Sequence, residues 1–193
     1  MADNPGVDAV ELKSELAARA RGLGFTLFGI APAARPNRED YILEWVRAGR
    51  HGDMAWLARG IDRRLDPRLV LPGAQSLIMV GQNYHAAPPE HDPVIAAYAR
   101  GSDYHAILEP RLRTLADWLG AQSGCSTRVY VDTGPLIERD AAARAGIGWI
   151  GKSTMLISET LGTHFFLGAI ITDLALPPDA TAADRCGRCT RCI

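Results

Sequence analysis

Residues 76–81 read SLIMVG, a short apolar run without a charged side chain. Pro67 and Pro72 mark a loop before it, and a run of this length between turn signals is typical of a buried strand. Four further stretches, found by working outward from this run, are also expected to be strands. They are FTLFGI at 25–30, TRVYV at 127–131, and the segments 154–158 and 165–172, which we expect to be neighbours.

Apolar residues at helical spacing lie between these strands. The expected helices are 8–22, which Asp8 is placed to cap, then 38–48, 54–59, 103–122 and 135–145. Alternating strands and helices predict an α/β (α+β) fold, with a central mixed sheet flanked by helices. We expect one domain over residues 1–180. Residues 181–193 are polar and rich in cysteine, so we expect them to open a second, small module.

The composition of the 193-residue chain is that of a globular protein. Hydrophobic residues make up 47%, and the formal net charge of −1 gives no overall basic signature for nucleic acid. The N-terminus lacks the charged and apolar regions of a secretory signal, and no apolar stretch is long enough to cross a membrane. We therefore expect a cytoplasmic protein without membrane contact.

Three of the four cysteines, Cys186, Cys189 and Cys192, form a C-x-x-C-x-x-C pattern. This clustering favours thiolate ligands over a disulfide framework. The bacterial ferredoxin run continues with a fourth cysteine three residues later, which here would lie beyond Ile193. We therefore expect an iron–sulfur motif that is cut short, in a chain that is a fragment. Zinc is the alternative metal, although its sites usually pair cysteines across a longer spacer.

Residues 146–153 read GIGWIGKS and match the phosphate-loop pattern G-x-x-x-x-G-K-[ST]. That loop binds nucleotide between a strand and a following helix. Here the expected helix precedes the loop and the expected strand follows it, so we reject nucleoside-triphosphate binding. The glycines still permit close approach of the backbone to a ligand, and they equally suit an ordinary helix end at Gly146.

Several motifs together resemble the epoxyqueuosine reductase family. They are YARGSDYH at 98–105, VDTGPLIERDAAARAGIGWIGKST at 131–154, FFLGAIITDL at 165–174 and DRCGRCTRC at 184–192. The family motif usually has GKNT where this chain has Gly151-Lys-Ser-Thr154. The resemblance implies a nitroreductase-like, cobalamin-binding catalytic domain over residues 1–180, followed from residue 181 by the start of a ferredoxin-like domain.

The resemblance also implies an activity and its partners. The family reduces epoxyqueuosine to queuosine at the wobble position of tRNA, using cobalamin and two four-iron, four-sulfur (4Fe-4S) clusters. We expect the present fragment to be inactive by itself. The implied partners are this tRNA and an electron donor such as a flavodoxin or ferredoxin system, and we expect a monomer. A related corrinoid and iron–sulfur reductase, similar to the reductive dehalogenases and acting on a small molecule, is the alternative.

Site residues carry over from the family by position. The implied proton donor is Asp132, in the VDTG motif. Taken without the resemblance, Asp132 equally suits a cap for the helix beginning at Pro135. The implied cofactor-binding set is Tyr98, Tyr104, His105, Asp132, Lys152, Ser153, Thr154 and Ile157, and the implied metal ligands are Cys186, Cys189 and Cys192. We expect Glu138 and Asp140 to matter much less, and we assign Met54, Trp56 and Leu57 to the core.

Overall fold

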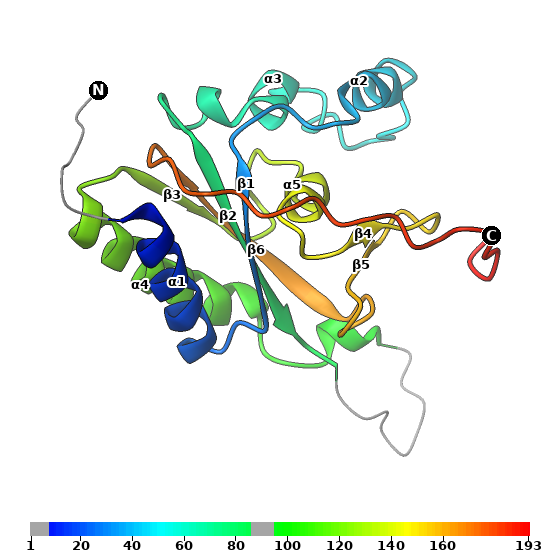
Figure 1. Ribbon diagram of the computed structural model, residues 1–193. Coiled ribbons are helices and arrows are strands. Elements are labelled where there is room, and N and C mark those ends of the chain that lie inside the picture. Colours follow the sequence, from blue (N-terminus) through cyan, green and yellow to red (C-terminus); the bar gives the residue numbers. More distant parts are fainter. Residues whose placement is uncertain (1–7, 86–94) are drawn as a thin grey trace.

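A computed structural model describes residues 8–85 and 95–193, which are built around a four-stranded sheet (Figure 1). Its strands are β1 (Leu27–Pro32), β2 (Ser76–Asn83), β3 (Thr127–Tyr130) and β6 (Phe165–Thr172), in the order β1-β2-β6-β3. A separate hairpin pairs β4 (Trp149–Ile150) with β5 (Leu156–Ile157). The α/β fold with helices flanking a central sheet is confirmed.

Residues 77–80 of β2 are all apolar because both faces of the sheet are covered. Ile78 and Val80 belong to a core shared with the helices α1 (Ala9–Gly22) and α4 (Tyr104–Ser123). Leu77 and Met79 point to the opposite face and belong to a core shared with α5 (Glu138–Arg144). Side chains alternate between faces along a strand, so SLIMVG supplies both cores at once.

Two helices begin where the sequence provides an aspartate as N-cap. Asp8 accepts from the amide of Val10 at the start of α1, and Asp103 accepts from the amide of His105 at the start of α4. The helix α4 runs through Pro110 without a break. The helices α2 (Glu39–Arg47) and α3 (Ile61–Leu65) lie between β1 and β2, together with a 3-10 turn at Pro67–Leu69. A second 3-10 turn, Ala97–Ala99, lies between β2 and α4.

The expectation of a mixed sheet is corrected, because every described strand pair of the sheet is antiparallel. The connection from β1 to β2 explains one such pair. Pro32 at the end of β1 lies opposite Ser76 at the start of β2, so the intervening 33–75 segment leaves and re-enters the sheet at the same end of the strands. Parallel strands would need a connection that crosses to the opposite end of the sheet.

Other sequence expectations are corrected locally. The strand expected at 154–158 pairs with β4 instead of β6, since residues 149–157 close a short hairpin of their own. Residues 54–59 form turns, and the helix begins at Ile61. Met54 and Trp56 are exposed and Leu57 is half-buried, contrary to a core assignment. The guanidinium of Arg64 lies over the Trp56 ring, 5.1 Å from its centroid.

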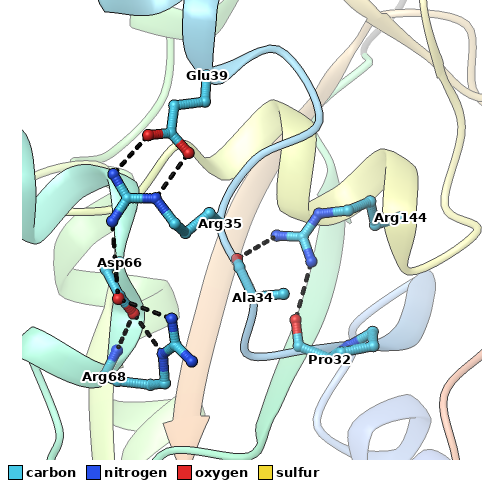
Figure 2. Close-up of polar contacts among 7 residues, drawn as sticks. All are labelled: Pro32, Ala34, Arg35, Glu39, Asp66, Arg68 and Arg144. Atoms are coloured by element: carbon cyan, nitrogen blue, oxygen red, sulfur yellow. Dashed lines mark hydrogen bonds and ion pairs between the residues drawn. The ribbon is translucent and has the colours of Figure 1, made fainter.

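Polar contacts fasten α5 to the end of β1 (Figure 2). Arg144 is buried and donates to the carbonyl oxygens of Pro32 and Ala34, at 2.8 and 3.3 Å. It also pairs with Asp140 at 2.7 Å. The helix lies so close to the strand that a Cβ added to Gly29 would come 2.0 Å from the carbonyl oxygen of Ala145. This docking fixes the position of the residues at the start of α5.

Candidate active site

The turn after β3 holds Asp132 in an uncommon backbone conformation. Asp132 has a φ of 59°, in the left-handed region that few residues other than glycine adopt. Two residues later the chain passes so close to Tyr130 that a Cβ on Gly134 would lie 2.4 Å from its ring. The Asp132 side chain is 64% exposed. The turn therefore presents a carboxyl group outward at the edge of the sheet.

Tyr104 is the direct partner of this carboxyl group. Its hydroxyl donates a hydrogen bond to Oδ2 of Asp132 at 3.0 Å. Its ring stacks on Phe166, with centroids 4.1 Å apart and planes inclined by 11°. Burial, and then the hydrogen bond to Asp132, raise the pKa of Tyr104 to about 12. Tyr104 is therefore a hydrogen-bond donor throughout the physiological pH range.

His105 lies beside Tyr104 and is oriented by Asp103. The two rings of Tyr104 and His105 stack with centroids 4.1 Å apart, and Nδ1 of His105 lies 2.9 Å from a carboxylate oxygen of Asp103. Nε2 of His105 is buried and lies 4.0 Å from Oδ2 of Asp132. The start of α4 thus brings two polar groups to Asp132, the Tyr104 hydroxyl and the His105 ring, and Asp103 orients the second.

Glu138 contacts the backbone of Asp132, whereas Tyr104 contacts its side chain. Its Oε1 accepts a hydrogen bond from the backbone amide of Asp132 at 3.1 Å. Burial, and then the negative charge of Asp132, raise the pKa of Glu138 to about 7. Two carboxyl groups and a tyrosine hydroxyl therefore meet at one turn, an arrangement that can hold and transfer protons near neutral pH.

Three cavities adjoin around these residues. The first, of about 200 Å³, is lined by Tyr104, Asp132, Glu138, Arg139 and Phe166 among others. The second, of about 530 Å³, shares Tyr104 and Phe166 with it and is also lined by Tyr98 and Arg100. The third, of about 370 Å³, shares Arg139 and is lined by Lys152 and Thr154. Together they form a concave surface far larger than any one of them.

The glycine-rich segment 146–154 has the order of elements that excluded a phosphate loop, with α5 before it and the β4–β5 hairpin around it. The amide of Thr154 donates to the carbonyl of Gly151 at 2.9 Å, so it is not free for a ligand. Gly146 has a φ of 78° just after the end of α5, as expected of a glycine that ends a helix.

Lys152 connects this segment to the cysteine tail. Its Nζ donates to the carbonyl oxygens of Gly187 and Cys189, at 2.9 Å each. The side chain therefore reaches the tail as well as lining the third cavity. Neither Ser153 nor Ile157 lines the three cavities formed by the described residues. Ile157 packs instead in the hairpin, opposite Trp149.

The cysteines of the tail are free thiols. Cys189 and Cys192 are exposed and Cys186 is half-buried, and the amide of Cys189 donates to the carbonyl of Cys186 at 2.9 Å. Within residues 8–85 and 95–193, the side chains of His, Cys, Asp and Glu form no group of three placed to hold a metal ion. The thiols have the chemistry of cluster ligands, but they do not converge in this conformation.

Sequence reasoning missed Glu138, Arg139 and Phe166 as members of the site. Phe166 belongs to a buried strand, where an aromatic residue is ordinary. Glu138 and Arg139 lie in the first turn of α5, where acidic residues are common for reasons of helix stability. The position of Glu138 six residues after Asp132, on the far side of a glycine-containing turn, is the one signal that could have suggested a contact.

Comparison with known proteins identifies relatives of this chain. Residues 64–133 match the family model described as epoxyqueuosine reductase QueG, DUF1730. The epoxyqueuosine reductase of Gloeobacter violaceus is 41% identical over 186 residues, which cover 93% of this chain and 58% of the relative. That of Xanthomonas campestris is 38% identical over 196 residues, covering 96% and 55%. The chain thus spans a little over half the length of these relatives.

Solved structures of epoxyqueuosine reductases are also similar to this chain. An epoxyqueuosine reductase bound to an epoxyqueuosine-modified tRNA-Tyr stem loop has a TM-score of 0.85 at 28% identity, covering 96% of this chain and 51% of that chain. The Bacillus subtilis enzyme, solved with its catalytic aspartate loop swung out of the active site, has a TM-score of 0.82 at 27% identity, with 96% and 51% coverage. A B12-dependent reductive dehalogenase shares the fold alone, with a TM-score of 0.64 at 18% identity and 96% and 22% coverage.

The layered sheet and its cavities therefore define a class, the fold that epoxyqueuosine reductases share with reductive dehalogenases. Within that class the sequence matches are specific to one branch. The chain belongs to the epoxyqueuosine reductase family.

Among the described residues, no helix combines the length and apolar character that crossing a bilayer requires.

Proposed function

We propose that this chain provides the catalytic, cobalamin-binding part of a cytoplasmic enzyme that reduces epoxyqueuosine in tRNA to queuosine. The observation that carries the proposal is the Asp132 carboxyl group at the edge of the first cavity, with the Tyr104 hydroxyl hydrogen-bonded to it. The family relationship supports it, and so does the relative that was solved with an epoxyqueuosine-modified stem loop.

The reaction requires a proton source at the reacting oxygen. Opening an epoxide to an alkene consumes two electrons and two protons and releases the oxygen as water. A positioned acid typically accelerates such a proton transfer by about 10²–10⁴-fold. Asp132 is our candidate donor, because the family resemblance implies that role and its side chain lines the first cavity. Tyr104 keeps its own proton near neutral pH and orients the carboxyl group.

The concave surface suits a large, flat cofactor. Aromatic faces of Tyr98 and Tyr104 line the second cavity, and Lys152 and Thr154 line the third. The buried Nε2 of His105 lies near Asp132, without a hydrogen-bond partner among the described residues. We assign cobalamin binding to this surface, with Ser153 and Ile157 as flanking members of the set. When bound, cobalamin supplies the low-valent cobalt chemistry that delivers electrons to a carbon–oxygen bond.

The cysteine tail is our candidate source of cluster ligands. A 4Fe-4S cluster takes four ligands, and Cys186, Cys189 and Cys192 supply three thiolates, so a fourth ligand must join them. The two hydrogen bonds from Lys152 hold this tail against the segment that lines the third cavity. The tail is therefore close to the proposed cofactor surface, as electron delivery requires. A flavodoxin or ferredoxin system is the proposed electron donor.

The charge around the cavities favours tRNA over a small-molecule substrate. Arg100 and Arg111 line the second cavity, and Arg139 lies between the first and third. Arginine is well suited to contact phosphate. The net charge of the whole chain is −1, so this concentration of arginine is a local feature of the surface around Asp132.

The proposal is tested by cofactor binding followed by conversion. The chain, extended to the full length of its relatives, is loaded with cobalamin under anaerobic, reducing conditions, desalted, and examined by its visible spectrum. Epoxyqueuosine-modified tRNA is then added with a chemical reductant, and the nucleosides are separated and identified by mass. We expect retained corrinoid absorbance and a product lighter by one oxygen atom. Loss of all corrinoid on desalting would overturn the cofactor assignment.

A further inference from the structure

Glu138 makes a contact that the proposed mechanism does not use. It begins α5, and its Oε1 accepts the backbone amide of Asp132 at 3.1 Å while its side chain lines the first cavity. The contact is made to the backbone of Asp132, so it acts on the path of the turn. The carboxyl group of Asp132 is left free for Tyr104.

The Asp132 turn needs such a contact. A left-handed conformation at a residue other than glycine is strained and persists where surrounding contacts determine it. Three contacts from distant elements do so here. Glu138 accepts the amide of Asp132, Tyr104 donates to its carboxylate, and Nη1 of Arg64 donates to the carbonyl of Gly134 at 3.3 Å. The first two act on Asp132 itself.

We propose that Glu138 is a positioning residue, which fixes the direction of the Asp132 carboxyl group by holding the Asp132 amide, and that this hold depends on the charge of Glu138. An ionised carboxylate accepts a stronger hydrogen bond from an amide than a neutral carboxyl group does. The hydrogen bond from the Asp132 amide is therefore stronger when Glu138 is ionised, whereas repulsion between the two carboxylates opposes it. The inference rests on the proposed function only for the use that catalysis makes of Asp132.

The groups that face Glu138 support a change of charge near neutral pH. They are Asp132 and Tyr104 across the cavity, Arg139 beside it on α5, and Arg64 from α3. Burial and the Asp132 charge together raise the pKa of Glu138 to about 7, against the smaller opposing effects of the Asp132 amide and the two arginines. The contact between Glu138 and the Asp132 turn therefore changes as Glu138 gains or loses its proton near pH 7.

The Asp132 amide proton reports this directly by NMR of the ligand-free chain. In the wild type we expect its resonance to move upfield as pH falls through about 7, because the carboxylate acceptor becomes neutral. Glu138→Gln keeps an oxygen acceptor but has no charge to lose, so this movement should vanish while the amide stays protected. Glu138→Leu removes the acceptor, and exchange of the Asp132 amide at pH 8 should become about tenfold faster.

Glu109→Gln is the matched control, because Glu109 forms an exposed pair with Arg113 on α4 and lies outside the site. It should leave the Asp132 amide unchanged at every pH. An Asp132 amide that does not titrate in the wild type would overturn the inference. So would a titration that persists in Glu138→Gln, or equal exchange rates in Glu138→Leu and the wild type.

A second measurement separates this inference from the proposed function. In cobalamin-loaded protein, the rate of epoxyqueuosine reduction should change in the wild type as pH crosses about 7, and should change less in Glu138→Gln. If neither protein converts the tRNA, the proposed function fails while the NMR result still decides the positioning role. If both convert it with the same pH profile, Glu138 charge does not control Asp132.

Discussion

The hydroxyl of Tyr104 donates a hydrogen bond of 3.0 Å to Oδ2 of Asp132, 28 residues further along the chain. The contact joins the first turn of α4 to the turn after β3. Stacking on Phe166 fixes the tyrosine ring, so the hydroxyl reaches the carboxylate from a rigid support. The orientation of Asp132 is therefore determined by the packing of the sheet as well as by its own turn.

Tyr104→Phe should separate this orientation from packing. Phenylalanine keeps the stack on Phe166 and loses only the hydroxyl. We expect turnover of epoxyqueuosine tRNA to fall about tenfold, the typical value of one hydrogen bond to a charged group, with cobalamin retention unchanged. Glu109→Gln, at an exposed residue of α4 outside the three cavities, is the control. Turnover of Tyr104→Phe equal to the wild type would show that the hydroxyl does not orient Asp132.

The raised pKa of Glu138 also predicts a pH dependence of folding stability. Its pKa is about 7 in the folded protein, against about 4.5 ordinarily. Between these values the folded protein keeps a proton that the unfolded chain loses, so the contribution of Glu138 to stability declines as pH rises through this window. Glu138→Gln does not titrate. Its free energy of unfolding, relative to the wild type, should therefore rise between pH 4 and pH 8 by on the order of 3 kcal/mol.

Urea unfolding of the two proteins at matched pH measures this difference. The relative stability of Glu138→Gln should change mainly between pH 4.5 and pH 7, and be level above pH 8. A difference that is constant from pH 4 to pH 8 would mean that Glu138 titrates normally in the folded protein.

The contact between α5 and β1 should be important for stability. Arg144 and Asp140 form a buried pair, and Arg144 also serves two carbonyl oxygens of the connection after β1 (Figure 2). Arg144→Met leaves Asp140 buried without its partner, which typically costs about 3–5 kcal/mol. Arg113→Met breaks the exposed pair with Glu109 and should cost less than about 1 kcal/mol. Similar losses for the two variants, measured by denaturant unfolding, would contradict this account.

Lys152→Ala should loosen the cysteine tail. The substitution removes both hydrogen bonds to the carbonyl oxygens of Gly187 and Cys189. We expect faster hydrogen exchange over residues 186–192, measured by mass spectrometry, with the sheet unaffected. Nucleotide affinity should be at background in both proteins, because the 146–153 segment is not a phosphate loop. Saturable ATP·Mg binding that the substitution abolishes would revive the phosphate-loop interpretation.

The sequence predicted elements well where an apolar pattern is bounded by turn or cap residues. Examples are the strand at SLIMVG and the helix at 8–22, which Asp8 caps. It failed where long-range contact decides the outcome. Antiparallel pairing depends on where the 33–75 connection re-enters the sheet, which no local pattern records. Residues 54–59 have helical spacing, yet the chain turns there and Trp56 finds Arg64 at the surface.

The candidate site shows the same difference between what the sequence could predict and what depends on long-range contacts. Asp132 and Tyr104 were found through the family resemblance, and the structure brings them into contact. Glu138 was expected to matter little. Its position six residues after Asp132 in the sequence does not reveal that the turn folds back onto it. Its contact depends on the left-handed conformation of Asp132 and on Gly134 passing close to Tyr130. Those are tertiary features, and they appear only when the helix docks on the sheet.

The most direct test of the central claim is single-turnover reduction of epoxyqueuosine tRNA by cobalamin-loaded Asp132→Asn. Asparagine keeps the size of the side chain and can hydrogen-bond, but it cannot donate the carboxyl proton. We predict that the variant folds and retains cobalamin, and that its rate falls at least about 100-fold below that of the wild type. A rate near that of the wild type would contradict the assignment of Asp132 as the proton donor.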